Sequence, residues 1–182
     1  MGSFPLDLSD YEKHINYMIR YNLSPMLLLQ RRDKILPQEL IKYYTNIGIQ
    51  KFCVGSIDQA NIIKNVNPKA EIIGSITMQI SKEKLENNNY SSFDGFVLFF
   101  PFNRNIKLIK ELPNQYTYSL LVNSGCNIFC DGLSHWSVNS KSEEENIMKN
   151  CPRRKDNKIE HNIYIPNIDL QYFEPYIDYI KL

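Results

Sequence analysis

The sequence predicts a parallel α/β fold: an incomplete (β/α) TIM-type barrel that occupies residues 1–182 as one domain. Short strand candidates alternate along the chain with helical segments, which is the pattern of βαβ units in a parallel sheet. There are about seven strand candidates, one fewer than the eight strands that close a TIM barrel. A doubly wound open sheet is the alternative. It is weakened because no glycine-rich dinucleotide motif and no P-loop follows a strand.

The elements are expected in a regular order. A helix is predicted over 10–21, where apolar residues recur at helical spacing after the capping candidate Ser9. An apolar run of strand length follows at 24–30, and Pro37 suits the first turn of a second helix that ends at Gly48. Further strands are expected at 51–55, 71–77, 95–100, 116–122, 162–165 and 179–182, and further helices at 56–66, 81–87, 103–112 and 170–176.

Composition limits the class of protein. A net charge of +1 gives no field that favours nucleic acid or an anionic membrane. No apolar run approaches the roughly 20 residues that cross a bilayer, and the first residues lack the pattern of a secretory signal. We therefore expect a cytoplasmic protein without a membrane partner. In that compartment its four cysteines are reduced thiols or metal ligands rather than disulfides.

The cysteines gather after one strand. The nearly continuous apolar run at 116–122 suits a strand covered on both faces, and Asn123-Ser124-Gly125 is a turn signal after it. Cys126 and Cys130 follow directly, in the long segment after this central strand where a parallel α/β protein keeps its chemistry. By contrast, Cys53 lies mid-strand and is expected to be a core residue.

These cysteines allow three interpretations: metal ligands, buried thiols or a nucleophile. Cys126, Cys130 and the distal Cys151 suit an iron–sulfur cluster, and with His135 as fourth ligand they suit zinc. Equally, they can be ordinary buried thiols, because free cysteine is among the most buried residue types. A Cys–His nucleophile pair that uses His135 is the third possibility.

Three further residues are candidates for substrate binding. Ser75 and Asn123 lie near the ends of their strands on the expected active face, although both residue types also end strands for structural reasons. Arg104 opens a helix after a strand, where it suits an anion. A solvated arginine beside a helix cap is the alternative there.

The order of these features resembles the barrel core of the collagenase-like peptidases, family 32 of peptidase class U. The resemblance covers about residues 43–182. Its most specific element is the block of Asn123, Cys126, Cys130 and His135. The matching pieces are LIKYYTNIGIQKFCVGSIDQANIIKNVNPKAEIIGSI, FDGFVLFFPFNRNIKLIKELP, LLVNSGCNIFCDGLSHW and IYIPNIDLQYFEPYIDYIKL.

The resemblance implies a peptidase-like enzyme or a subunit of an iron–sulfur hydroxylase, since several relatives bind a cluster through cysteines and act in hydroxylation of RNA or of a quinone precursor. It implies a [4Fe–4S] cluster, with zinc as the alternative, and it keeps an RNA substrate open. The chain departs from the family at Asp131, where many members have proline. It also lacks a first barrel strand and the family's continuation after Leu182, so we expect a shortened barrel.

A second class of function follows from that departure. A degenerate barrel can act as a non-catalytic binding or partner module. Because an incomplete barrel leaves strand edges unpaired, either a homo-oligomer or a partner subunit is expected.

Overall fold

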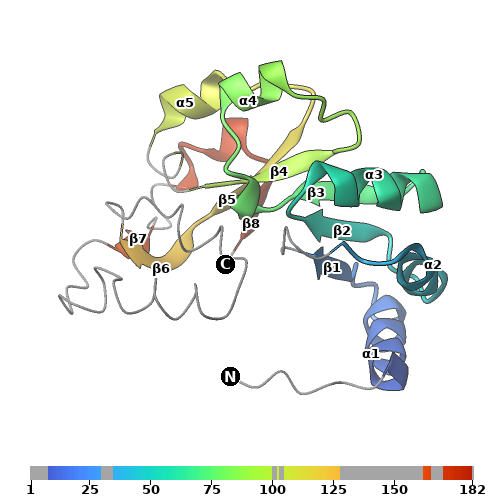
Figure 1. Cartoon of the computed structure of the whole chain (residues 1–182). Helices are drawn as coiled ribbons and strands as arrows, with labels where there is room; N and C mark the ends of the chain where they lie inside the picture. The colour runs from blue at the N-terminus through green and yellow to red at the C-terminus, as the bar shows by residue number, and fades with distance from the viewer. Residues whose placement is uncertain are drawn as a thin grey trace, which may run out of the picture.

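A computed structural model describes residues 8–29, 35–99, 102, 105–127, 162–164 and 170–181. Six parallel strands form one open sheet, as the sequence predicts for an incomplete TIM-type barrel (Figure 1). Its strands lie side by side in the order β1 (Met26–Leu29), β2 (Lys51–Val54), β3 (Glu71–Gly74), β4 (Gly95–Leu98), β5 (Thr117–Leu121) and β8 (Tyr179–Lys181). All five neighbouring pairs in this sheet are parallel.

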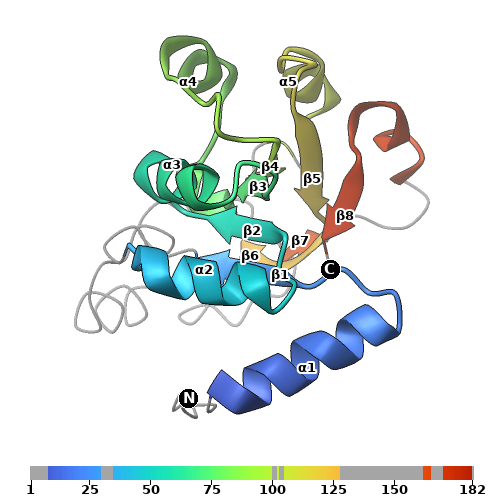
Figure 2. The ribbon, with the colours of Figure 1, turned by 90° about the vertical axis from the view of Figure 1, so that its right-hand side faces the viewer.

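Helices connect the strands on the outer side of the sheet (Figure 2). They are α2 (Gln38–Asn46), α3 (Ile57–Val66), α4 (Lys82–Asn87) and α5 (Ile106–Lys110), and α1 (Leu8–Arg20) precedes β1. Three of them begin at a side chain that caps the helix. The side chains of Ser56, Ser81 and Asn105 each accept a hydrogen bond from a backbone N–H in the first turn of α3, α4 and α5.

The two faces of the sheet carry different side chains. Phe52, Ile72 and Phe96 are fully buried in the large core between strands and helices. Cys53, Ile73 and Val97 alternate with residues of that core and form a second apolar cluster with Ile76. The prediction that Cys53 is a core residue is confirmed, since its relative exposure is 1%. Because the helices cover one face and this cluster fills the other, the sheet has the two sides of a barrel wall.

Some predicted elements were wrong in extent. The strand predicted at 71–77 ends at Gly74, because Ser75 caps a 3-10 turn, η1 (Ile76–Met78). The first helix begins at Leu8, so Ser9 lies inside it rather than capping it. The helix predicted at 170–176 contains the 3-10 turn η4 (Glu174–Tyr176), and the helix predicted at 103–112 is described only as α5 after its Asn105 cap.

One prediction was wrong in kind. The residues predicted as a turn, Asn123-Ser124-Gly125, begin a strand, β6 (Asn123–Asn127). The strand predicted at 162–165 is confirmed as β7 (Asn162–Tyr164), but it pairs antiparallel with β6 in a separate two-stranded sheet instead of joining the parallel sheet. In addition, β5 is not continuously buried. Tyr118 and Leu120 are buried while their neighbours are partly exposed, which is the alternation of a strand with one fully covered face.

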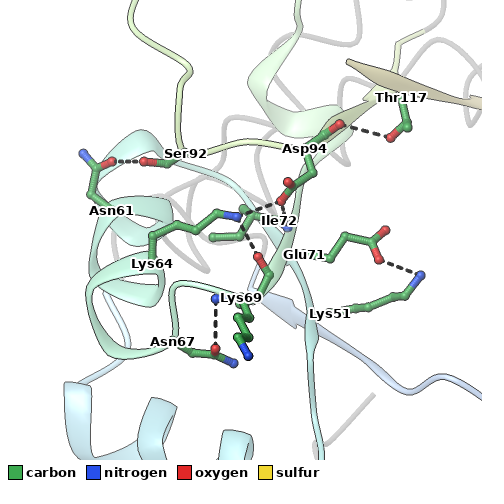
Figure 3. Close-up of polar contacts among 11 residues, drawn as sticks. Lys51, Asn61, Lys64, Asn67, Lys69, Glu71, Ile72, Ser92, Asp94 and Thr117 are labelled. Carbon is green, nitrogen blue, oxygen red and sulfur yellow. Dashed lines mark hydrogen bonds and ion pairs between the residues drawn. The ribbon is translucent and has the colours of Figure 1, made fainter. Parts of the chain in front are cut away.

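Aspartates hold the amino-terminal ends of the strands in place. Asp94 directly precedes β4, and its Oδ2 accepts hydrogen bonds from the Ile72 N–H at 2.8 Å and from Lys64 Nζ at 3.0 Å (Figure 3). The Asp94 N–H donates to the Ile72 carbonyl, and the Asp94 carbonyl accepts from the backbone N–H and the hydroxyl of Thr117. Three neighbouring strands, β3, β4 and β5, are thereby tied at one residue.

The same arrangement recurs at β8. Asp178 directly precedes this strand, its Oδ2 accepts from the Tyr118 N–H at 2.7 Å, and its own N–H donates to the Tyr118 carbonyl at 2.9 Å. Tyr118 is further fixed by its hydroxyl, which donates to the Pro113 carbonyl, and burial raises the pKa of its phenol.

Lys51 and Glu71 form an ion pair at this end of β2 and β3, with 2.7 Å between Lys51 Nζ and Glu71 Oε2. The hydrogen bond with Glu71 raises the pKa of Lys51, and Tyr179 of β8 also contributes.

Candidate functional site

The candidate site lies at the carboxyl edge of the parallel sheet. Ser75 follows β3 there, and β6 continues beyond β5 after the single residue Val122. Figure 1 shows the ribbon of β6 and β7 projecting from the end of β5, away from the helices. This edge is where (β/α) barrels carry their binding and catalytic groups.

Strand β6 contains an irregularity at Cys126. Ser124 pairs with Ile163 and Asn127 pairs with Asn162. The two pairs are consecutive on β7, but Gly125 and Cys126 lie between them on β6. Those two residues therefore bulge out of the ladder. Bulges re-aim side chains and are frequent next to active sites.

Asn123 and Cys126 are both on this ribbon. Asn123 is its first residue and pairs with Tyr164, two positions after the end of β5, close to its predicted place at the exit of a strand. The structure thus places two members of the predicted block on one short strand at the carboxyl edge. The ribbon ties that strand to residues about 40 positions later in the chain, a pairing that costs only a few kcal/mol of loop-closure entropy.

Ser75 is at the same edge but in a closed environment. It is fully buried, and its Oγ accepts a hydrogen bond from the Thr77 N–H at 3.3 Å. The preceding Gly74 lies against the core, where a Cβ would come within 2.2 Å of the Phe96 ring. The hydroxyl of Ser75 therefore shapes the turn after β3 rather than opening into solvent.

An apolar layer lies next to this edge. The cluster of Cys53, Ile73, Ile76 and Val97 is buried, and Phe99 and Leu121, at the carboxyl ends of β4 and β5, pack against it. Thr77, a buried polar residue, was not predicted as part of the edge. The only sign in the sequence was that Thr77 ends the strand predicted at 71–77, whereas in the structure it lies in the turn after β3.

Four predicted site residues lie outside the described residues: Cys130, His135, Cys151 and Arg104. The predicted metal site and the predicted anion contact of Arg104 therefore stay predictions. Within the described ranges, no group of three or more His, Cys, Asp or Glu side chains is placed to hold a metal ion. The same ranges contain no helix that is long and apolar enough to cross a membrane.

Comparison with known proteins supports the fold. No protein-family model and no curated protein matches the chain. Among solved structures, the chain is similar to that of the U32 peptidase Mk0906, with a TM-score of 0.65 and 11% sequence identity. The similarity covers 99% of this chain and 77% of that one. At this identity the likeness shows the fold alone: the chain has the fold of a U32 peptidase structure, here as an open sheet of six parallel strands.

Proposed function

We propose that the chain is a collagenase-like protein of the U32 type that binds a metal centre at the carboxyl edge of its sheet. The ligands in this proposal are Cys126, Cys130 and Cys151, with His135 near them. The centre is a [4Fe–4S] cluster, or zinc if His135 completes the set. The observation that supports it is the bulge at Gly125 and Cys126, located beyond β5 at the edge where barrels of this kind carry their chemistry.

The bulge suits a ligand for a physical reason. In a regular ladder, alternate side chains point to fixed faces, and the backbone groups are engaged with the neighbouring strand. Gly125 and Cys126 lie between two consecutive pairs, so they are outside the regular register of the ladder. Thiolates select zinc and iron–sulfur clusters, so the donor set fits the proposed centre. Closing a loop of about 20 residues between ligands costs a few kcal/mol, whereas a structural zinc site contributes about 10–16 kcal/mol.

Metal analysis tests this proposal directly. The protein would be purified without oxygen, and its iron, zinc and acid-labile sulfide would be measured together with the visible absorption spectrum. We expect stoichiometric metal in the native chain and a loss of most of it in Cys126→Ala, Cys130→Ala and Cys151→Ala. Cys53→Ala is the matched control, because Cys53 is buried in β2 within the core. Equal metal content in all four variants would overturn the shared site.

The activity that we propose is that of an enzyme, or an enzyme subunit, acting on a peptide, an RNA base or a small molecule. The likeness to a structure described as a peptidase makes peptide hydrolysis the first reaction to test. Release of fluorescent fragments from labelled gelatin would be compared between the native chain and Cys126→Ala. No fragment release from the native chain while its metal is bound would move the proposal to the hydroxylase-type alternative. Equal release from the native chain and Cys126→Ala would mean that Cys126 takes no part in hydrolysis. In the substrate site we retain Asn123 and Arg104, and we assign Ser75 to the support of the turn.

We also propose that the protein associates with a second copy or a partner subunit. Strands β1 and β8 are the edges of the six-stranded sheet, and Met26, Leu28 and Tyr179 on them are exposed by 41%, 55% and 52%. Unpaired edges with exposed apolar side chains are where sheets add strands. Light scattering after size exclusion would give the mass of the particle. We expect Leu28→Lys to reduce any assembly to the monomer, and Tyr17→Lys on α1, a residue that is 62% exposed, is the control. A monomer at all concentrations would reject self-association. Association with a partner subunit would then be the remaining proposal, and co-purification of such a subunit would test it.

A further inference from the structure

We draw no further inference here: the strongest candidate outside the site and the sheet edges, the buried Gln59 side chain at the start of helix α3, has an Nε2 without a partner among the described residues, but the residue is only 2% exposed, its Oε1 already accepts from the Leu36 N–H, and the helix start beside it is capped by Ser56 and carries the carboxylate of Asp58.

Discussion

The two edges of the parallel sheet are built differently. At the amino edge, Asp94 and Asp178 tie neighbouring strands through charged hydrogen bonds of 2.7–3.0 Å. At the carboxyl edge, the Ser75 side chain accepts one longer bond of 3.3 Å within its own turn, whereas the Ser75 N–H donates to the Val54 carbonyl at 2.7 Å. After Val122, β5 is followed by the bulged ribbon. The difference teaches that aspartate side chains join the strands at the amino edge, whereas at the carboxyl edge the strands are joined by backbone bonds and are followed by irregular backbone. In barrels the amino edge serves stability and the carboxyl edge serves chemistry.

The two aspartate contacts also differ from each other. In both, the carboxylate accepts from the N–H of the second residue of the neighbouring strand, and the aspartate N–H donates back to that residue's carbonyl. Asp94 has additional partners, because Lys64 reaches its Oδ2 and also donates to the Ala70 carbonyl, and Thr117 bonds its carbonyl from β5. Asp94 therefore connects three strands and a helix, whereas the described contacts of Asp178 connect β5 and β8.

Removing the Asp94 carboxylate should have the largest effect. Asp94→Ala leaves the Ile72 N–H without its acceptor next to a fully buried side chain, and it separates Lys64 from its ion-pair partner. Because the variant loses a charged hydrogen bond and leaves its donor unsatisfied, we expect the free energy of unfolding to decrease by about 3 kcal/mol. Urea denaturation followed by circular dichroism would measure it. The exposed Glu86→Ala on α4 is the control, expected within about 0.5 kcal/mol of the native chain. Equal midpoints for the two variants would mean that the amino edge is not held by Asp94.

Asp178→Ala should cost less, about 2 kcal/mol, because it removes one charged hydrogen bond without separating an ion pair. The backbone bond from the residue 178 N–H to the Tyr118 carbonyl can persist in this variant. The same denaturation measurement applies, and amide hydrogen exchange at Leu120 and Leu121 would localise the loss to the pairing of β5 with β8. If Asp178→Ala were more destabilising than Asp94→Ala, the ranking of the two contacts would be wrong.

Ser75→Ala should cost about 1 kcal/mol, the typical loss for removing a serine cap. Among the described residues, the hydroxyl accepts a hydrogen bond from the Thr77 N–H, and the alanine methyl fits the same buried volume. Because the Ser75 hydroxyl is buried and bonded within its own turn, we expect this change to leave metal content unchanged. A loss of metal together with unchanged stability would instead make Ser75 part of the functional site.

The smallest effect is expected for Lys64→Met, about 0.5 kcal/mol, since partly exposed ion pairs contribute little. The informative measurement is a double-mutant cycle with Asp94→Ala. If Lys64 acts through Asp94, its substitution in the Asp94→Ala background should cost less than in the native chain. Additive losses would show that the Lys64 bond to the Ala70 carbonyl is what matters.

The sequence by itself determined the parallel α/β alternation, since hydrophobic runs and capping residues are local signals. Ser56 and Ser81 begin helices where predicted, and Cys53 is in the core as its mid-strand position indicated. It also determined that Asn123 and Cys126 come directly after the strand at 116–122. These features need only neighbouring residues along the chain.

The tertiary structure decided the rest. The sequence assigned Asn123-Ser124-Gly125 to a turn, because those residue types favour turns. Pairing with Asn162–Tyr164 makes them a strand and leaves Cys126 in a bulge. Likewise, nothing local marks Asp94 or Asp178 as strand contacts, because their partners Ile72 and Tyr118 belong to other strands. Propensity is a property of a segment, whereas the register between distant segments is set by the packing of the whole sheet, which overrides weak local preferences.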